Sequence, residues 1–492
     1  MGAVLQRAAF SPNIRDRLDF SCAVFDAKGE LCAQAAHIPV HLGSMAYAMQ
    51  SIVSQLEWHE GDTVIVNDPF LGGTHLPDIT LISPVYYDGK LLAFIANRAH
   101  HADIGADSPG SMPLSKSLEE EGLIIPPTHL IEQGKMNQTF MSEILSSIRS
   151  GSAAQGDFSA QISANNAGVE RLCSLISSLD ATSFLTALSK LNDYGERLAK
   201  SVISDIPNGE YVFSDVMDDD GLGNFDLKIT ATINVKDENV FVDFTGTTDQ
   251  TEGNINCPLS VAAAAVYYVF RCLMPNQTPA CAGSFRPITL TAPEGCLINA
   301  KRPAAVAAGN VETSTRIVDV VMGALAQALP DKIPAASHGS MNNLAMGSVT
   351  DGWDYYETMG GGMGASSSGD GIDAVQTHMT NTRNTPIEVM ETSYPVRIKQ
   401  YAIRKNSGGV GLHKGGDGLV REFEFLKPAN VTLLTERRLY SPWGLNDGID
   451  GGCGQNVLNG KALTPKICFD VEAGDCLTIK TPGGGGWGKM SD

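Results

Sequence analysis

The chain has 492 residues, of which 43% are hydrophobic and 18% charged, and it contains 51 glycines and 24 prolines. This composition is typical of a globular protein of about two to four domains, and it excludes a disordered or collagen-like chain. Lys and Arg number 35 against 55 Asp and Glu, and the formal net charge of -20 makes nucleic acids and anionic membrane surfaces poor partners.

The predicted fold is α+β, with three regions in chain order. Residues 1–135 alternate short β-like runs with glycine turns, so we expect a sheet-rich region there. Residues 136–208 place apolar side chains three and four positions apart, a spacing that predicts two or three helices. Residues 209–492 return to strand signals and include an apolar run at 261–273 that indicates a buried helix. Glycine pairs and triplets punctuate the rest of this mixed region and predict many loops.

The chain shows no sign of a membrane span or of a secretory signal. No apolar run approaches the ~18 residues that a transmembrane helix needs, and residues 1–10 lack a charged start followed by an apolar stretch. We therefore expect a cytoplasmic protein. The ten cysteines are spread along the chain without a Cys-x-x-Cys pair, so we interpret them mostly as small buried side chains.

Histidines cluster near the start of the chain, where seven of the ten fall within the first 129 residues. His75 and Asp78 lie in the segment 67–78, whose paired glycines and two prolines exclude the middle of a helix. We expect a tight loop that leads into a strand over 79–87. That strand ends at Asp88-Gly89, a favoured hairpin turn, and a return strand follows from Lys90.

The expected register of this hairpin places Asp78 opposite Ala99 and Pro77 opposite His100. Because neighbouring strands lie ~5 Å apart, His75, Asp78 and His100 would converge at the open end of the hairpin.

A second hairpin, expected over residues 19–34, would bring Asp19 near His37. Asp19 is therefore a possible fourth ligand in the same region. Imidazole nitrogens with carboxylate oxygens suit Zn²⁺, Mn²⁺ or Fe²⁺, and this inventory leaves a position for water, as catalytic sites require. The alternative is that these residues are ordinary loop residues that cap turns.

Three further residues are candidates for catalytic roles. His101 points away from His100 because adjacent strand residues face opposite sides, so proton transfer or positioning is expected of it, together with Asp103. A structural histidine is the alternative. Glu121, the last of three consecutive glutamates, is a candidate general base, although such charge runs often form a solvated face.

The chain lacks a GxxxxGK[ST] phosphate loop and a GxSxG nucleophile motif. If the reaction needs ATP, we therefore expect another chain to bind it.

Several motifs distributed over almost the whole chain belong together. They are Ser11-Pro12-Asn13-Ile14 with Arg17 to Ser21, His37 to Gly43, Asn67 to Asp78, His100 to Gly105, Gly360 to Ala365, Asn381 to Glu388, Ser407-Gly408-Gly409 and Thr481 to Gly488. In these motifs the chain resembles the hydantoinase B/oxoprolinase family.

The resemblance implies a division of labour between two proteins. The family includes the B-type components of ATP-dependent hydantoinases and 5-oxoprolinases, and related subunits of acetone and acetophenone carboxylases. A hydantoinase A-type partner would bind ATP and phosphorylate the amide or enol oxygen, and this chain would complete the reaction at one divalent metal ion, with zinc or manganese expected. The family pattern puts the metal ligands at Asp19, His75, Asp78 and His100. Family members also carry a longer segment ahead of Met1, and Asp19 is the expected ligand nearest to it.

The expected function is hydrolysis of the phosphorylated amide of 5-oxoproline or a hydantoin by metal-activated water, within a hetero-oligomer. Asn381, Arg383 and Asn384 are candidates for holding a substrate carboxylate or phosphate, with loop capping as the alternative, and the glycine-rich loops would let backbone approach a small ring. Two alternative functions are a subunit of an ATP-dependent ketone carboxylase and a structural subunit with a degenerate site.

Overall fold

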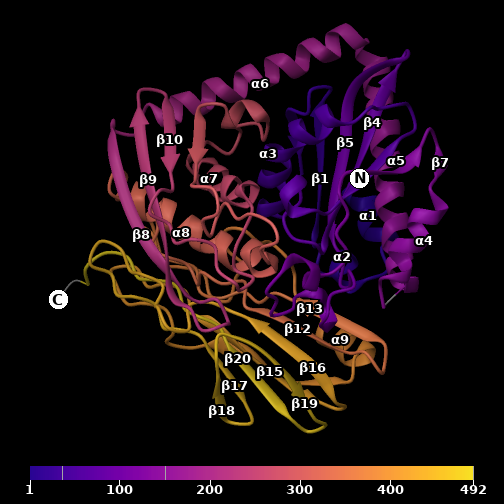
Figure 1. The fold of residues 1–492 in the computed structure, drawn as a ribbon. Helices are drawn as coiled ribbons and strands as arrows, with labels where there is room; N and C mark the ends of the chain where they lie inside the picture. The colour runs from indigo at the N-terminus through magenta and orange to yellow at the C-terminus, as the bar shows by residue number, and fades with distance from the viewer. Residues whose placement is uncertain (36, 150, 491–492) are drawn as a thin grey trace.

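The computed structural model of the protein describes residues 1–35, 37–149 and 151–490. It has the mixed α+β architecture that the sequence predicts, with four sheets and helices packed against them (Figure 1). The helices are α1 (Gly2–Ala8), α2 (Pro12–Arg15), α3 (Pro39–Gln55), α4 (Gln138–Ser146), α5 (Gly151–Leu179), α6 (Ala181–Ile203), α7 (Leu259–Leu273), α8 (Ser314–Ala326) and α9 (Ile387–Ser393).

The N-terminal part is a seven-stranded sheet in the order β2-β1-β5-β4-β3-β6-β7. Side chains alternate between its two faces: Val64 and Ile82 pack with α3, whereas Ile65 and Leu81 pack with Phe158 of α5. The sheet is therefore covered on both sides, which buries its central strands. Its strands are β1 (Phe20–Asp26), β2 (Leu31–Gln34), β3 (Thr63–Val66), β4 (Asp78–Tyr87), β5 (Lys90–His100), β6 (Thr128–Glu132) and β7 (Lys135–Met136).

Helices α4, α5 and α6 follow this sheet within residues 138–203, where helices are predicted. Helix α6 runs along the top of the molecule in Figure 1 and leads to the second sheet. Among the described residues no single helix is long and apolar enough to cross a membrane, although Ala153–Leu179 and Ala181–Ile203, bent by 105°, meet the length and composition test as a pair. The division of the chain into three regions remains a prediction.

The second sheet has four strands in the order β11-β10-β9-β8; α8 packs against β8 and β9, and α7 packs against α8 (Figure 1). Helix α7 is the buried helix that the apolar run at 261–273 predicts. It also packs against α3, where a Cβ on Gly43 would lie 2.6 Å from Cα of Ala264, so this glycine permits the close helix contact. The strands are β8 (Gly209–Asp219), β9 (Phe225–Lys236), β10 (Asn239–Asp243) and β11 (Ile288–Thr291).

The C-terminal part contains two sheets that share one core, to which Leu344, Val431, Phe423 and Leu477 contribute. Their orders are β13-β12-β16-β19 and β14-β15-β20-β17-β18. The strands are β12 (Asn343–Ser348), β13 (Trp353–Glu357), β14 (Val396–Arg404), β15 (Gly418–Phe425), β16 (Ala429–Leu434), β17 (Gln455–Leu458), β18 (Lys461–Leu463), β19 (Lys466–Val471) and β20 (Cys476–Lys480).

The glycine-rich loops of this part pack against one another. The Gly416 amide donates to the Met363 carbonyl at 2.8 Å, and the Gly484 amide donates to the Gly416 carbonyl at 2.9 Å. A Cβ on Gly362 or Gly415 would collide with the backbone of a neighbouring loop. These glycines serve loop-to-loop packing, which differs from the expectation that they approach a substrate ring.

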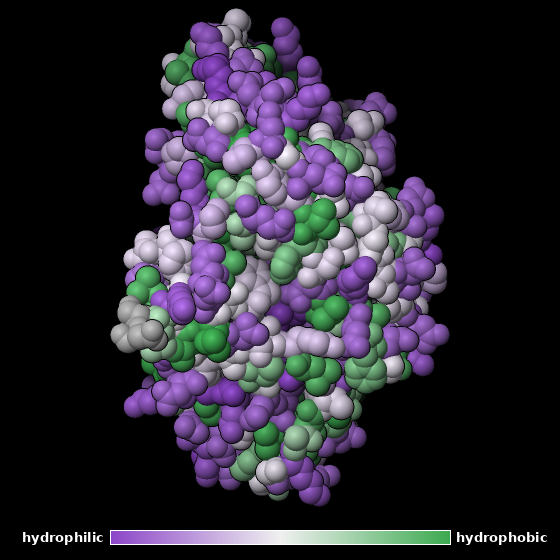
Figure 2. Space-filling view, turned by 90° about the vertical axis from the view of Figure 1, so that its left-hand side faces the viewer, coloured by the Kyte–Doolittle hydropathy of each residue, from purple (hydrophilic) through white to green (hydrophobic). Residues whose placement is uncertain are grey.

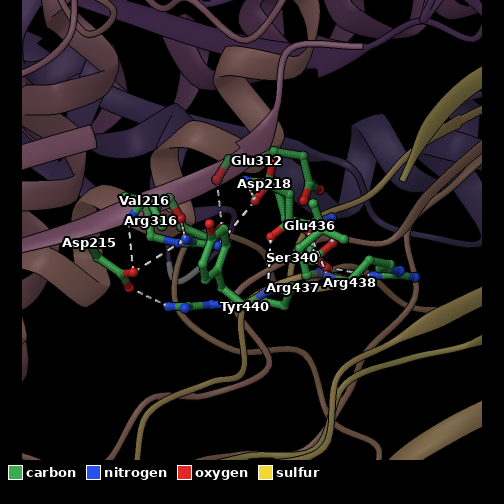
Figure 3. A network of polar contacts seen from close by, with 12 residues as sticks. Asp215, Val216, Asp218, Glu312, Arg316, Ser340, Glu436, Arg437, Arg438 and Tyr440 are labelled. Atoms are coloured by element: carbon green, nitrogen blue, oxygen red, sulfur yellow. Dashed lines mark hydrogen bonds and ion pairs between the residues drawn. The ribbon is translucent and has the colours of Figure 1, made fainter. Parts of the chain in front are cut away.

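A buried ionic network, shown in Figure 3, joins β8 and α8 to the segment 436–440. Arg437 Nη2 lies 2.7 Å from Asp215 Oδ2 and 2.5 Å from Asp319 Oδ2, and Arg316 Nη2 lies 3.1 Å from Glu436 Oε2. These arginines are at most 1% exposed. Their charges are balanced by contacts with acidic side chains, so the network ties the second sheet to the C-terminal part.

The molecular surface is mixed in polarity. Figure 2 shows hydrophilic side chains predominating at the top of the face, with hydrophobic ones scattered among polar neighbours lower down. The ten cysteines are free; five are buried, three are partly buried, and Cys272 and Cys468 are exposed. Half of them therefore match the expectation of small buried side chains.

Candidate metal site

The hairpin formed by β4 and β5 positions two of the predicted ligands. Its turn has positive φ at Asp88 and Gly89, as a tight two-residue hairpin turn requires. The predicted register holds next to the turn, but it shifts between Val85 and Tyr86 and leaves Leu92 as an extra residue. This β-bulge moves every later pair by one position.

Asp78 consequently pairs with His100, and Ile79 pairs with Ala99. The predicted pairing of Asp78 with Ala99 was wrong by this one step. The observed pairing favours a metal site, because directly opposed residues project their side chains on the same face of the sheet. His100 Nδ1 lies 3.2 Å from Asp78 Oδ1.

The loop before β4 places His75 as the sequence predicts. Asn67 holds the loop: its Nδ2 donates to the Leu76 carbonyl at 2.8 Å, and its Oδ1 accepts from the Ile125 amide at 2.7 Å. Gly73 packs so closely on Asn67 that a Cβ there would collide with its carbonyl. His75 is thereby carried into the interior, and its Nε2 lies 3.2 Å from Asp78 Oδ2.

His75, Asp78 and His100 each offer a ligand atom, and these atoms all lie within 4.8 Å of one another. His75 Nδ1 lies 3.1 Å from the Ala307 carbonyl, to which only a protonated Nδ1 can donate, so Nε2 is the nitrogen left to bind a metal ion. The same reasoning applies to His100, whose Nδ1 faces the Asp78 carboxylate. Neither Nε2 has a hydrogen-bond partner. The three residues fit a divalent cation because they offer two imidazole nitrogens and one carboxylate.

Burial and charge oppose one another at this site. Burial raises the pKa of the Asp78 carboxyl, but His41 and His75 outweigh it and hold that pKa well below its usual range. Burial lowers the pKa of His75, but Asp78 outweighs it and the net shift is upward. For His100 burial prevails and its pKa is lowered. Asp78 therefore stays ionised, as a metal ligand must.

Asp19 lies beside these residues because of a strand pairing that the sequence did not predict. The β1–β2 hairpin forms, but Asp19 reaches the site because β1 pairs with β5 and its carbonyl accepts from the His100 amide at 3.0 Å. Its carboxylate lies 3.7 Å from Arg17 Nη2. His37 packs on Phe20 instead, with ring centroids 4.9 Å apart.

A cavity of about 20 Å³, the small cavity, is lined by Asp19, His41, His75 and His100 among others. This volume holds about one water molecule or ion. Asp19 borders the small cavity but stands outside the group of three whose ligand atoms lie within 4.8 Å.

Three residues that the sequence analysis missed complete the surroundings. His41, in the first turn of α3, places Nε2 3.1 Å from Asp78 Oδ2. Asn310, in the π-helix Gly309–Thr313, places Nδ2 3.3 Å from the same oxygen. The ring of Tyr356 stacks on His100, with centroids 4.5 Å apart and planes 19° apart. The histidine cluster near the N-terminus offered a signal for His41, whereas Asn310 and Tyr356 come from distant segments that carry none.

The three catalytic candidates lie around the small cavity but do not line it. His101 Nε2 lies 2.9 Å from Gln161 Oε1, and its ring packs on Phe158. Asp103 accepts from the Gly105 amide at 2.9 Å and also contacts the partly buried Arg149. Both side chains contact neighbouring segments of the fold, and their catalytic role remains a prediction.

Glu121 contacts the backbone that faces His75. Its Oε1 accepts from the amides of Val306 and Ala307 at 2.8 and 2.9 Å, and the Ala307 carbonyl faces His75 Nδ1. Burial raises the pKa of the Glu121 carboxyl to about 7. This geometry suits a residue that positions His75, where the sequence analysis expected a general base.

The three candidates for substrate binding do not form one site. Asn381 lines a second cavity of about 470 Å³, the large cavity. Asn384 Nδ2 donates to Glu357 Oε1 at 2.9 Å, and the exposed Arg383 donates its amide to the Arg17 carbonyl. Asn384 thus stabilises a loop, as the alternative interpretation has it, and substrate binding by the three residues remains a prediction.

Comparison with known proteins agrees with this architecture. The family model described as Hydantoinase B/oxoprolinase matches residues 1–490. An uncharacterised protein of Methanocaldococcus jannaschii is 43% identical, over 99% of this chain and 88% of its own length. 5-Oxoprolinase 1 of Arabidopsis thaliana is 42% identical over 99% of this chain, which spans 40% of that protein. The B-type subunit of a putative D-/L-hydantoinase from a Pseudomonas species is 32% identical, over 99% of this chain and 87% of its own length.

Two solved structures share the fold. The ATP-dependent caprolactamase of Pseudomonas jessenii has a TM-score of 0.92 and 27% identity, covering 99% of this chain and 88% of that chain. An acetone carboxylase has a TM-score of 0.87 and 15% identity, covering 99% and 73%. The chain belongs to the hydantoinase B/oxoprolinase family.

Proposed function

We propose that this chain is the metal-bearing subunit of an ATP-dependent cyclic amidohydrolase and opens the phosphorylated amide of a hydantoin or a 5-oxoproline-like lactam. A hydantoinase A-type subunit would bind ATP, within a cytoplasmic hetero-oligomer. The names of the relatives, a 5-oxoprolinase, a component of a hydantoinase and a caprolactamase, support cyclic amides as the substrate class.

The observation that carries the proposal is the buried group of His75, Asp78 and His100, with ligand atoms within 4.8 Å of one another and two imidazole Nε2 atoms that lack a hydrogen-bond partner. Such atoms are costly to bury unless something binds them. Zinc or manganese suits the ligand set, and Asp19 borders the same small cavity as a further ligand candidate. When bound, the ion would supply Lewis acidity and lower the pKa of water.

The chain's own residues orient the ligands and keep bulk water out. Ala307 and Asp78 fix which nitrogen of His75 and His100 carries the proton. Thr74 Oγ1 donates to Asp78 Oδ2 at 2.7 Å and holds the carboxylate in place. His75, Asp78 and His100 are at most 2% exposed, which keeps the local dielectric constant low and strengthens every charge interaction.

The first test is the metal content of the purified chain, measured by mass spectrometry, for wild type, His75→Ala and His59→Ala. His59 is a half-exposed histidine outside the site and serves as the control. We expect a stoichiometric ion in wild type and His59→Ala and its loss in His75→Ala. A metal-free wild-type chain that stays so after zinc or manganese is added would refute the proposal and favour a structural subunit.

The second test adds the A-type subunit and ATP and follows ring opening of hydantoin and 5-oxoproline. The shared fold with acetone carboxylase makes a role in a ketone carboxylase the competing function. Bicarbonate-dependent consumption of a ketone, without ring opening of either amide, would support the carboxylase and contradict the hydrolase.

A further inference from the structure

Tyr356 covers one face of a predicted metal ligand. Its ring stacks on the imidazole of His100, with centroids 4.5 Å apart and planes 19° apart, and it lines the small cavity beside that histidine. Aromatic rings at this separation attract one another. Tyr356 belongs to β13 in the C-terminal part of the chain, whereas His100 ends β5. A side chain of the C-terminal part therefore contacts a ligand that the N-terminal hairpin carries.

The hydrogen bond of His100 does not by itself fix the orientation of its ring. Nδ1 lies 3.2 Å from Asp78 Oδ1, and the outer torsion of a histidine side chain has broad energy wells. One such contact therefore leaves the imidazole free to tilt. A second ring against its face removes this freedom and fixes the direction of Nε2, the nitrogen that has no hydrogen-bond partner. Contacts that orient a ligand in this way tune the affinity of a site for its metal ion.

The hydroxyl end of Tyr356 is anchored by a chain of buried hydrogen bonds. The hydroxyl lies 2.7 Å from Asn343 Oδ1. Asn343 Nδ2 donates to Glu312 Oε1 at 2.6 Å and to the Leu434 carbonyl at 2.8 Å. Because both of these groups are acceptors, the amide must present its oxygen to Tyr356, and the tyrosine hydroxyl must donate. The side chains of Tyr356, Asn343 and Glu312 are at most 1% exposed, so water does not compete for these bonds.

Arg17 holds Tyr356 at its backbone and at its ring. Arg17 Nη1 donates to the Tyr356 carbonyl at 2.7 Å, and the guanidinium carbon lies 5.1 Å from the centroid of the ring, within the range of a cation–π contact. Arg17 is itself fully buried, and its Nη2 donates to Thr358 Oγ1 at 3.2 Å. The position of the Tyr356 ring is therefore determined by its hydroxyl, its backbone and a buried arginine.

The π-helix Gly309–Thr313 supports two of the predicted ligands. It carries Glu312, where the hydrogen-bond chain from Tyr356 ends, and Asn310, whose Nδ2 lies 3.3 Å from Asp78 Oδ2. π-Helical turns are rare and occur frequently at functional sites. This one short element supports Asp78 directly and His100 through the chain of hydrogen bonds.

We propose that Tyr356 is a positioning residue of the metal site, which holds His100 in the orientation that binds the ion and is itself held by Asn343. This inference rests on the proposed function and goes beyond it, because it gives β12 and β13 a part in metal binding. The neighbouring Tyr355 provides the contrast. It is also buried, but it packs in the core of the C-terminal sheets and against Tyr394, with ring centroids 4.8 Å apart.

The test is the dissociation constant of zinc for the full chain, measured by competition with a chelator. We expect Tyr356→Leu, which removes the stacked ring, to raise this constant about ten- to a hundredfold. Tyr356→Phe keeps the ring and loses only the hydrogen bond to Asn343, so it should raise the constant only about two- to tenfold. Tyr355→Leu and Tyr355→Phe are the matched controls and should bind zinc as wild type does. Urea denaturation of every variant separates a loss of fold from a loss of metal affinity.

Histidine-selective NMR of the metal-free chain gives a second readout. The ring current of Tyr356 should shift the ring protons of His100 upfield, and the resonance is assigned by its absence in His100→Gln. This shift should persist in Tyr356→Phe and in both Tyr355 variants and disappear in Tyr356→Leu.

The outcomes separate this inference from the proposed function. If the wild-type chain binds zinc, then wild-type affinity in Tyr356→Leu, or an equal loss of affinity in Tyr355→Leu, would overturn the inference and leave the proposed function intact. Should Tyr356→Leu not fold, a wild-type dissociation constant in Tyr356→Phe would overturn it. A wild-type chain that binds neither zinc nor manganese would overturn the proposed function and this inference with it.

Discussion

Two buried polar clusters in this protein are built from different partners. In the network of Figure 3, acidic groups meet permanent cations: Asp215 and Asp319 contact Arg437, and Glu436 contacts Arg316 and Lys466. At the candidate metal site, Asp78 contacts imidazoles, and no Lys or Arg forms an ion pair with it in the part of the chain that the structure describes.

The difference separates a structural role from a functional one. An acidic group paired with arginine carries its counter-charge in the fold, and breaking such a pair destabilises the protein. Asp78 is surrounded by imidazoles and by hydroxyl and amide donors, and the buried Nε2 atoms of His75 and His100 lack hydrogen-bond partners, so a bound cation would fit among these groups. Substitutions in the two clusters should therefore affect different properties.

The largest effect is expected from Asp78→Asn. This change keeps the shape of the side chain but removes the charge that a cation needs. We expect loss of bound metal and at least about a hundredfold lower activity in the assay with the A-type subunit and ATP. Asp331→Asn, at an exposed aspartate that does not line the small cavity, is the control. Full metal content in Asp78→Asn would remove the distinction between the clusters.

Arg437→Gln should break the structural cluster. Leaving Asp215 and Asp319 without their buried cation is expected to lower the free energy of unfolding by about 3–5 kcal/mol, measured by urea denaturation. The metal content of the folded variant should equal that of wild type. The comparison would be contradicted if the variant kept wild-type stability but lost its metal.

Glu312→Gln tests the pH dependence of the structural cluster. Burial and the nearby Glu436 raise the pKa of Glu312 to about 7 from an ordinary value of 4.5. The folded state therefore holds a proton that the unfolded state releases, and this contribution is complete below about pH 4.5 and lost as the pH rises through 7. Between pH 5 and 8 wild type should lose up to about 3 kcal/mol of stability relative to the variant. Parallel curves for the two proteins would contradict the shift, and Glu119→Gln, on an exposed glutamate, should follow wild type.

The smallest effect is expected from Glu121→Gln. The change weakens the support behind Ala307 and thus the orientation of His75, without touching the small cavity. We expect the metal dissociation constant to rise about ten- to a hundredfold, measured by competition with a chelator. An unaffected dissociation constant would contradict this role, because it would mean that the Ala307 carbonyl keeps its place without Glu121. Glu121→Ala, which also removes the carboxylate, should raise the dissociation constant as well.

The sequence predicted the local parts of the fold well. The Asp88-Gly89 turn, the loop that carries His75 and the helix at 261–273 all follow from residue types with strong backbone preferences. The convergence of His75, Asp78 and His100 followed from one hairpin, because few residues separate its strands.

The features that the sequence did not predict depend on contacts between distant segments of the chain. Asn310 and Tyr356 reach the site from parts of the chain more than 200 residues away from Asp78, and no local pattern marks them. The glycine motifs were recognisable as loops, but their packing against one another depends on the tertiary structure. Nothing local showed that Asn384, a candidate for anion binding, donates to Glu357.

The extra residue at Leu92 takes up the one residue by which the two arms of the hairpin differ in length. Removing Leu92 would leave Ala93 opposite Val85 and His100 opposite Asp78, so the bulge itself tolerates a deletion. A residue added or removed between Ala93 and His100 would instead move His100 one step and turn it toward the opposite face, because strand side chains alternate. The pairing of Asp78 with His100 therefore depends on an exact residue count in that stretch, where insertions and deletions should be tolerated far less than substitutions.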